Sequence, residues 1–234
     1  MILQLQDIHA YYGTSHILQG VSLSIDKGEG VCLLGRNGAG KSTTFKSIVG
    51  LLSIKKGRIL FKGNEITRKQ PFKIARLGIG YVPEDRRIYP DLTVKENLEV
   101  GQKAAKIQKG SWSIEKIFDF FPPLKPMANR KGSQMSGGEQ QMLTIARSLM
   151  GNPELLLLDE PSEGLAPIVV DDLGHLIRRI RDEGVSVLIA EQNSLFSLEL
   201  VDRAYVIEKG IIEWEGSVKE ISEDETLRNR YLSV

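Results

Sequence analysis

Eight consecutive residues near the N-terminus have the types and spacing of a loop that binds phosphate groups. Glycines allow such a loop to turn so tightly that successive backbone N–H groups converge on phosphate oxygens. The lysine brings a compact positive charge to the outer phosphates, and the serine hydroxyl is a ligand that Mg²⁺ accepts. This pattern predicts binding of a nucleoside triphosphate together with Mg²⁺. The loop consists of Gly35, Arg36, Asn37, Gly38, Ala39, Gly40, Lys41 and Ser42.

The residues on either side of this loop predict the elements that must position it. The apolar run Gly30 to Leu34 is typical of a buried strand, and a helix is expected over Thr43 to Val49. The positive end of the helix dipole would face the phosphates, and we count Thr43 among the nucleotide-binding residues. A glycine-rich turn with a chance lysine is the alternative, but strand, loop and helix in succession favour the phosphate loop.

A second pair of residues predicts where hydrolysis takes place. Leu155 to Leu158 is typical of a central buried strand, and Asp159 and Glu160 follow it. Open α/β sheets bind their ligands at this carboxyl end. We expect Asp159 to hold Mg²⁺ through water, and Glu160 to polarise the water that attacks the γ-phosphate. An acidic pair that only ends a strand is common, but its combination with a phosphate loop favours the catalytic interpretation.

A third motif begins the helix that is expected over Glu139 to Met150. Ser136 is placed as the helix N-cap, and Glu139 three residues later completes a capping box. Two glycines, Gly137 and Gly138, directly follow the cap. They expose backbone N–H groups at the helix N-terminus, which is an anion site.

With this motif the chain resembles the ATP-binding-cassette (ABC) ATPases, whose signature is Leu-Ser-Gly-Gly-Gln. Met135 stands for the leucine and Glu139 for the glutamine, and the resemblance extends over essentially the whole length. It implies that the signature of one subunit, here Ser136 to Glu139, contacts the γ-phosphate bound to another subunit. ATP would then be sandwiched in a head-to-tail dimer of two-fold symmetry. The second subunit is either this chain or a related cassette.

The same resemblance implies further assignments. Tyr12 matches the aromatic residue that stacks on adenine, with Tyr11 as the alternative; Tyr12 could also simply end a strand. The loop Ser162 to Ala166 matches a segment that communicates across the dimer. The helical segment over approximately 85–150 matches the subdomain that docks onto membrane-spanning permease subunits. Through such a permease, an importer ATPase acts indirectly with an extracytoplasmic substrate-binding protein.

Two positions depart from the general pattern of this family. Glu84 stands where most cassettes carry a glutamine that links Mg²⁺ to the membrane partner, and we count it among the metal residues. Gln192 stands where most carry a histidine that senses the γ-phosphate. As a catalytic residue, a glutamine can orient the attacking water, whereas the alternative is that it only caps the helix near Asn193. Both substitutions, and the sequence of residues 84–98, resemble those of the ATPases of branched-chain amino-acid importers.

The order of the elements predicts an α/β fold of the P-loop NTPase (RecA-like) type. Strands at Leu3 to His9, Val21 to Ile25 and Arg58 to Phe61 alternate apolar and polar residues, which suits an antiparallel β subdomain. Helices are expected within the inserted segment 85–150, and alternating strands and helices from 154 to 208 predict a mainly parallel sheet. We expect residues 1–234 to form a single nucleotide-binding domain.

Composition narrows the possible partners. The 234 residues carry a net charge of +1, so nothing indicates nucleic acid as a partner. No apolar run approaches the roughly 18 residues of a transmembrane segment. The lone Cys32 cannot form an internal disulfide, in keeping with a reducing compartment. We therefore expect a peripheral protein on the cytoplasmic side of the cell membrane, held there by its partners.

Other functions are disfavoured to different degrees. An ABC ATPase acting on DNA or ribosomes would resemble types with a long coiled-coil insert or two tandem cassettes, and this chain has neither feature. A non-hydrolytic regulator usually lacks the carboxylate that Glu160 supplies. Import of another solute, or export of lipid or lipopolysaccharide, stays open. The favoured function is ATP hydrolysis in an importer of branched-chain amino acids.

Overall fold

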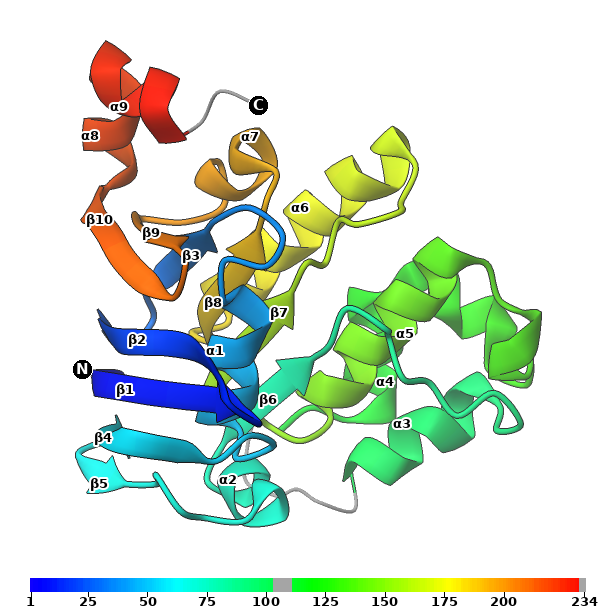
Figure 1. Ribbon diagram of the computed structural model, residues 1–234. Helices are drawn as coiled ribbons and strands as arrows, with labels where there is room; N and C mark the ends of the chain where they lie inside the picture. Colours follow the sequence, from blue (N-terminus) through cyan, green and yellow to red (C-terminus); the bar gives the residue numbers. More distant parts are fainter. Residues whose placement is uncertain (103–110, 232–234) are drawn as a thin grey trace.

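Two β-sheets organise the fold (Figure 1). The computed structural model describes residues 1–102 and 111–231, and within these ranges one sheet has four strands and the other six. The first is antiparallel and contains, in spatial order, β2 (Ser15–Ile25), β1 (Leu3–Tyr12), β4 (Ile54–Phe61) and β5 (Asn64–Glu65). The second is parallel except for its first strand and contains β10 (Ile211–Ser217), β9 (Arg203–Glu208), β3 (Gly30–Leu34), β8 (Ser186–Glu191), β7 (Leu155–Asp159) and β6 (Ile79–Val82).

Helices pack against the six-stranded sheet and also form a separate layer beside it (Figure 1). The helices against the sheet are α1 (Lys41–Ile48), α2 (Pro71–Arg76), α6 (Pro167–Asp182) and α7 (Ser194–Leu198). The helical layer contains α3 (Val94–Gln102), α4 (Ile114–Phe120) and α5 (Gly137–Leu149), with the short 3₁₀ helices η1 (Pro122–Met127) and η2 (Gly132–Gln134) between the last two. After β10 follow α8 (Val218–Glu223) and α9 (Glu225–Tyr231).

The central strands are apolar because both of their faces are covered. Every residue of β3, β7 and β8 is buried, and their side chains alternate between two cores. In β7, Leu155 and Leu157 join a core with α1 and the four-stranded sheet. Leu156 and Leu158 join a second core with α6 and the helical layer. The period of two along each strand therefore sends alternate side chains to opposite cores, and polar groups can gather only where the strands end.

The sequence predictions of the fold are confirmed, with shifts at the ends of elements. β3 has the predicted bounds, and the strand expected over Arg203 to Glu208 and the helix expected over Ile114 to Phe120 are present as β9 and α4. Pro122 and Pro123, which were expected to break the helical segment, follow α4. The first helix of the segment 85–150, expected over Thr93 to Val100, is present as α3 and ends at Gln102. Before it, Arg86 and Arg87 have φ of 57° and 39° and close a turn. Residues 103–110 of that segment lie outside the described residues. Short elements were not predicted: β5, β6, β10, α2, α8 and α9.

No helix in the described part of the chain has both the length and the apolar character that a membrane crossing requires.

The turn between β9 and β10 ties the two sheets together at Gly210. Its carbonyl accepts a hydrogen bond from the N–H of Gln19 on β2 (2.8 Å), and its N–H donates to the carbonyl of Ala39 in the phosphate loop (2.8 Å). Gly210 has a φ of 79°, and a Cβ at this position would overlap the carbonyl oxygen of Ile17. Both the backbone conformation and the close approach of the chains therefore require glycine here.

We expect Gly210→Ala to lower the free energy of unfolding by about 2 to 4 kcal/mol, because it combines a left-handed backbone with an overlap. The matched control is Gly63→Ala, which has a φ of 75° but no heavy atom within 4 Å of the added Cβ, and should cost about 1 to 2 kcal/mol. Equilibrium denaturation measures both values. Equal losses would show that the approach of Ile17 to the turn is unimportant.

Candidate active site

Three loops of the predicted site leave the six-stranded sheet at one edge. β3, β8 and β7 are parallel neighbours, and the register pairs the last residue of β3 with that of β8, and the last residue of β7 with Ala190. Their carboxyl ends therefore lie side by side, which is where ligands of open α/β sheets bind. The loop 35–42 follows β3, Glu160 follows β7 and Gln192 follows β8. The fold thus brings together three parts that are far apart in the sequence.

The loop 35–42 wraps around the side chain of Lys41. Gly38 and Gly40 have φ of 81° and 117°, the left-handed region in which glycine is favoured. Lys41 is the first residue of α1, and its side chain is only 3% exposed. Its Nζ donates hydrogen bonds to the carbonyl oxygens of Gly35 (2.6 Å) and Arg36 (3.2 Å). The strand, loop and helix that the sequence predicted are all present, and the ammonium group lies inside the loop.

The first turn of α1 contacts the carboxylates at the end of β7. Nζ of Lys41 lies 3.0 Å from Oε1 of Glu160, and the hydroxyl of Ser42 donates to Oδ1 of Asp159 at 3.0 Å. Thr43 is buried in the same turn. Glu160 has a φ of 46°, a left-handed conformation that costs about 1 to 3 kcal/mol and that neighbouring contacts must offset. Asp159, predicted for metal binding, and Glu160, predicted as the base, therefore lie against the phosphate loop. Glu84, the other carboxylate predicted for metal binding, acts on Asp159 through its charge.

Several carboxylates share this edge of the sheet, and their charges oppose one another. Asp159 is 1% exposed, and its second oxygen accepts a hydrogen bond from the hydroxyl of Tyr81 (3.0 Å), a residue that the sequence did not single out. Burial raises the pKa of Asp159, and the charges of Glu160 and Glu84 raise it further. A hydrogen bond with Glu160 is the main cause that raises the pKa of Glu163, and burial and nearby carboxylates act in the same direction. A divalent cation would relieve this repulsion.

The donor atoms at this edge fit Mg²⁺. The hydroxyl of Ser42 and the carboxylate of Asp159 are hard oxygen ligands, and Glu84 adds negative charge nearby. Among the described residues, no three His, Cys, Asp or Glu side chains form a metal site by themselves. Mg²⁺ is usually held by one or two carboxylates together with phosphate oxygens and water. The residues therefore suit a cation that arrives with a nucleotide.

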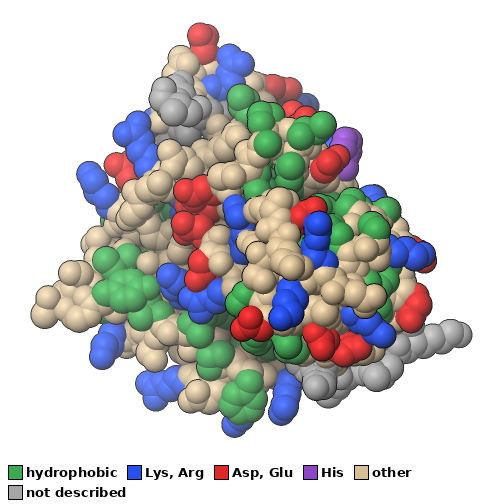
Figure 2. All heavy atoms as spheres, turned by 90° about the vertical axis from the view of Figure 1, so that its right-hand side faces the viewer, with side chains coloured by type: hydrophobic (Ala, Val, Ile, Leu, Met, Phe, Trp, Pro, Cys, Tyr) green, Lys and Arg blue, Asp and Glu red, His purple; other side chains and the backbone are tan. Residues whose placement is uncertain are grey.

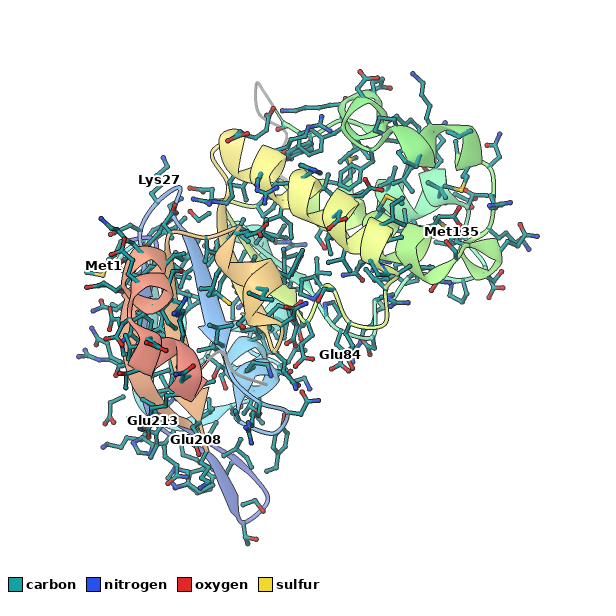
Figure 3. All side chains as sticks on the ribbon, turned by 90° about the horizontal axis from the view of Figure 1, so that it is seen from above. Met1, Lys27, Glu84, Met135, Glu208 and Glu213 are labelled. Carbon is teal, nitrogen blue, oxygen red and sulfur yellow. The ribbon has the colours of Figure 1, made fainter. Side chains whose placement is uncertain are left out.

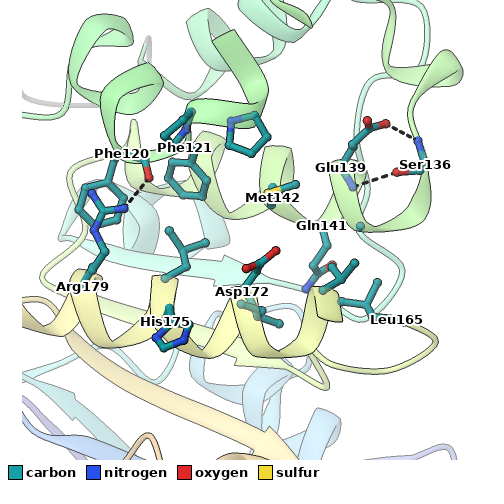
Figure 4. A pocket seen from close by; sticks show the side chains of 16 residues that line it. Phe120, Phe121, Ser136, Glu139, Gln141, Met142, Leu165, Asp172, His175 and Arg179 are labelled. Carbon is teal, nitrogen blue, oxygen red and sulfur yellow. Dashed lines mark hydrogen bonds between the residues drawn. The ribbon is translucent and has the colours of Figure 1, made fainter. Parts of the chain in front are cut away.

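The signature motif begins α5 on the helical layer. Figure 3 shows Met135, just before it, on that layer, with Glu84 between it and the sheets. The N–H of Ser136 donates to Oε2 of Glu139 (2.7 Å), and Oγ of Ser136 accepts from the N–H of Glu139 (3.4 Å), so the predicted capping box is present (Figure 4). Met135 is buried in the core, as a leucine would be. In helix geometry the N–H groups of Gly137 and Gly138 have no acceptor within the helix.

The two candidate tyrosines for adenine stacking have different surroundings. The ring of Tyr11 stacks on that of His16, with ring centroids 4.2 Å apart. Tyr12 ends β1, and its side chain is 47% exposed. Tyr12 is therefore the ring that offers a face to a ligand. Tyr12 belongs to the four-stranded sheet, the loop 35–42 follows β3 of the six-stranded sheet, and Ser136 begins α5 on the helical layer. The sequence-predicted site is therefore spread over three parts of the fold.

Gln192 does not cap the helix that follows it. Asn193 is the N-cap of α7, and its Oδ1 accepts from the N–H of Phe196 at 3.2 Å. The side chain of Gln192 is exposed beside the end of β8. The residue before it, Glu191, was not among the predicted site residues, although a carboxylate that ends an apolar strand is the signal that marked Asp159. Glu191 is 3% exposed, and burial raises its pKa.

A cavity of about 350 Å³ lies between α5 and α6 (Figure 4). Its walls are largely apolar, with Phe121 and Leu176 among the lining residues, and the first turn of α5 closes one end. No residue of the loop 35–42 lines it, so this cavity is separate from the phosphate site.

Comparison with known proteins identifies the family. A profile of the family described as ABC transporter matches residues 18–163. The chain is 41% identical over 231 residues to the high-affinity branched-chain amino acid transport ATP-binding protein BraG of Pseudomonas aeruginosa, covering 99% of each chain. It is 35% identical to a probable branched-chain amino acid transport ATP-binding protein LivF of Archaeoglobus fulgidus, over 100% of this chain and 99% of that one. It is also 36% identical to the lipopolysaccharide export system ATP-binding protein LptB of Escherichia coli, over 95% and 93%.

Solved structures have the same fold. A nucleotide-free ATP-binding cassette from an ABC transporter superposes with a TM-score of 0.84 and 30% identity over 100% of this chain and 99% of that one. An ATP-binding cassette in its ADP conformation gives a TM-score of 0.82 and 29% identity, with 100% and 99% covered. A dimeric bacterial ABC transporter cassette gives 0.81 and 25% identity, with 92% and 98% covered. The chain belongs to the ABC transporter family and is an ABC ATPase with a P-loop NTPase fold.

The ion pair between Lys41 and Glu160 leads to a prediction about nucleotide affinity. We expect Glu160→Gln to tighten ATP binding, because the carboxylate no longer competes with phosphate for the lysine, and to lower kcat by at least about 100-fold. Lys41→Ala should weaken ATP binding about 10-fold or more, because a charge-assisted hydrogen bond is lost. Calorimetric titration and phosphate release measure the two effects, with exposed Lys55→Ala as the charge control. An active Glu160→Gln enzyme would refute the role of general base.

The raised pKa of Asp159 leads to a prediction about stability and pH. Because this pKa is higher in the folded chain than its ordinary value, ionisation of Asp159 removes stability as the pH rises through the folded pKa. Asp159→Asn should therefore raise the melting temperature of the nucleotide-free protein at pH 7, and the gain should shrink as the pH falls toward 4. Thermal melts across this range test the prediction. A gain that does not vary with pH would show that charge is not its cause.

Proposed function

We propose that this chain is the ATP-hydrolysing subunit of an importer of branched-chain amino acids. The observation that carries the proposal is the 41% identity to BraG over 99% of both chains. Glu84 and Gln192, the two departures from the general pattern, support the same branch. In this proposal the chain acts on the cytoplasmic side of the membrane, attached to permease subunits that receive solute from an extracytoplasmic binding protein.

Export of lipopolysaccharide is the second candidate. The 36% identity to LptB over 95% of this chain favours it specifically, and the chemistry of ATP hydrolysis would be the same. The two functions differ in the membrane subunits to which the chain binds, because no residue of an ATPase subunit needs to touch the transported solute.

We assign the steps of hydrolysis to the groups at the edge of the sheet. The loop 35–42 and Lys41 bind the phosphates, while Ser42 and Asp159 hold Mg²⁺, which supplies charge neutralisation when bound. Glu160 accepts a proton from the attacking water, which it can reach once phosphate replaces it at Lys41. Gln192 donates one hydrogen bond to the γ-phosphate and accepts another from that water.

The separated parts of the site support a dimer. Tyr12 would stack on the adenine of the nucleotide bound to its own chain. The N–H groups of Gly137 and Gly138, with the Ser136 hydroxyl, would bind the γ-phosphate of the nucleotide on a second cassette. Glu139 would hold this helix end in shape through the capping box rather than bind ATP directly. A two-fold dimer lets each subunit complete the site of the other, and a solved relative is dimeric.

The helical layer is the proposed docking surface for the permease. Figure 2 shows the face that carries it: hydrophobic side chains reach the surface there in several places, between groups of basic and acidic ones. Tyr89 is an exposed hydrophobic residue that follows the turn after Glu84 and precedes α3 of this layer. If ATP binding moves the helical layer toward the phosphates, a permease docked on this layer would receive that movement.

Copurification tests the assignment to a transporter. The chain is coexpressed with the membrane-spanning subunits of a branched-chain amino-acid importer and, separately, with those of a lipopolysaccharide export complex. We expect a stable complex and stimulated ATP hydrolysis with the importer subunits only. Binding to the export subunits alone would overturn the proposal in favour of the second candidate.

Glu84→Ala tests the coupling. We expect this substitution to reduce the stimulation of ATP hydrolysis by the permease several-fold while the basal rate of the isolated chain changes little. The reason is that, among the residues the structure describes, no hydrogen bond joins Glu84 to the phosphate loop. The control is Glu65→Ala, which removes an exposed carboxylate on β5. Equal loss of basal and stimulated activity would show that Glu84 acts only at the metal site.

A further inference from the structure

Glu191 is a buried carboxylate whose charge is satisfied by hydrogen bonds. It ends β8 between the strands that carry the phosphate loop and Asp159, and it is 3% exposed. Within the described residues, no lysine, arginine or histidine forms an ion pair with it. A buried charge of this kind is costly unless donors surround it. The hydrogen-bond donors around Glu191 therefore identify the segments that this carboxylate holds in place.

Each oxygen of Glu191 serves a different loop. Oε1 accepts hydrogen bonds from the hydroxyl and the N–H of Ser162, at 2.6 and 3.1 Å. Oε2 accepts from the N–H groups of Gln192 and Asn193, at 3.2 and 3.4 Å. The first loop follows β7 and the second follows β8. One rigid, planar group thus joins the two loops, and only a carboxylate offers two equivalent acceptor oxygens for this purpose.

Both loops carry groups assigned to the reaction. Ser162 lies two residues after Glu160, which is held in a left-handed conformation and contacts Lys41. Gln192 directly follows Glu191. A hydrogen bond from the N–H of Glu160 to the carbonyl of Ala190 (2.9 Å) fixes the start of the first loop, and Glu191 fixes the position two residues further on. Glu191 therefore joins the loop that carries the proposed base to the loop that carries Gln192.

We propose that Glu191 is a positioning residue for ATP hydrolysis, which sets the spacing between Glu160 and Gln192 by bridging the two loops. The proposal rests on the proposed roles of these two residues. An amide at position 191 has one acceptor oxygen and one donor NH₂ group, so it can satisfy one loop but opposes the N–H groups of the other. The structural alternative is that Glu191 only satisfies donors near the start of α7, in which case its replacement would affect folding but not the rate of the folded enzyme.

The experiment compares Glu191→Gln with Ser162→Ala in the full-length chain. Ser162→Ala removes one donor to Oε1 and leaves the backbone bonds intact, so it tests the bridge even if Glu191→Gln folds poorly. The control is Glu199→Gln, a carboxylate that is 75% exposed and forms an ion pair with Arg178 at 3.3 Å. We expect both bridge variants to lower kcat about 10- to 100-fold, since small displacements of reacting groups have effects of this size. The Kd for ATP should change less than about twofold, and the melting temperature of Ser162→Ala should stay near that of the wild type.

A double-mutant cycle shows whether Glu191 acts through Gln192. If it does, Glu191→Gln should reduce kcat much less in a Gln192→Ala background than in the wild type, because the positioned group is already gone. Fully multiplicative effects, or wild-type kcat in both bridge variants while Gln192→Ala is slow, would overturn the proposal and leave the role of Gln192 intact. Wild-type turnover of Gln192→Ala would instead refute the role assigned to Gln192, and the proposal for Glu191 with it.

Discussion

The alternation of side chains along β3, β7 and β8 is the constraint on which the rest of the structure depends. Because these strands are buried on both faces, alternate residues fill two separate cores, and polar groups are excluded until the strands end. Lys41, Asp159, Glu160 and Glu191 all lie at that edge or directly after it. The same constraint that forms the core therefore gathers carboxylates where a metal-bound nucleotide is expected. Burial at this boundary raises the pKa of Asp159 and Glu191, so a cation there would favour their charged forms.

Strong local patterns made much of the fold predictable from the sequence. β3 is short and apolar and is followed by a glycine, and β7 is a run of leucines that ends in an acidic residue, so their ends and the groups that follow them could be placed. β6 was missed because four residues that include Gly80 give no periodic signal, and β10 because none of its residues is fully buried. The turn at Arg86 and Arg87 interrupts a segment whose composition favours a helix. Its left-handed backbone depends on packing against α5, where the Thr144 hydroxyl donates to the carbonyl of Arg86 (2.6 Å).

In the site, residues that belong to sequence motifs were predictable, whereas residues recruited by tertiary contact were not. Tyr81 donates to Asp159 from a neighbouring strand, and no spacing in the sequence relates the two. Glu191 was passed over because its function depends on the loop after β7, which lies far away in the chain. Two residues of the signature motif differ from the family's Leu-Ser-Gly-Gly-Gln, and the structure explains both differences. Met135 keeps the apolar character of that position, and Glu139 completes a capping box as glutamine also can.

The turn at Gly210 has a consequence for the ligand itself. Tyr12 belongs to the antiparallel sheet, whereas the phosphate loop follows a strand of the parallel sheet, and Gly210 is hydrogen-bonded to both layers. A nucleotide whose base rests on one layer and whose phosphates rest on the other would therefore act as a cross-link between them. The length of the nucleotide would have to match the separation of the two sheets. A ligand that lacks the base or the phosphates would contact one layer only, and the layers would be joined by the protein alone.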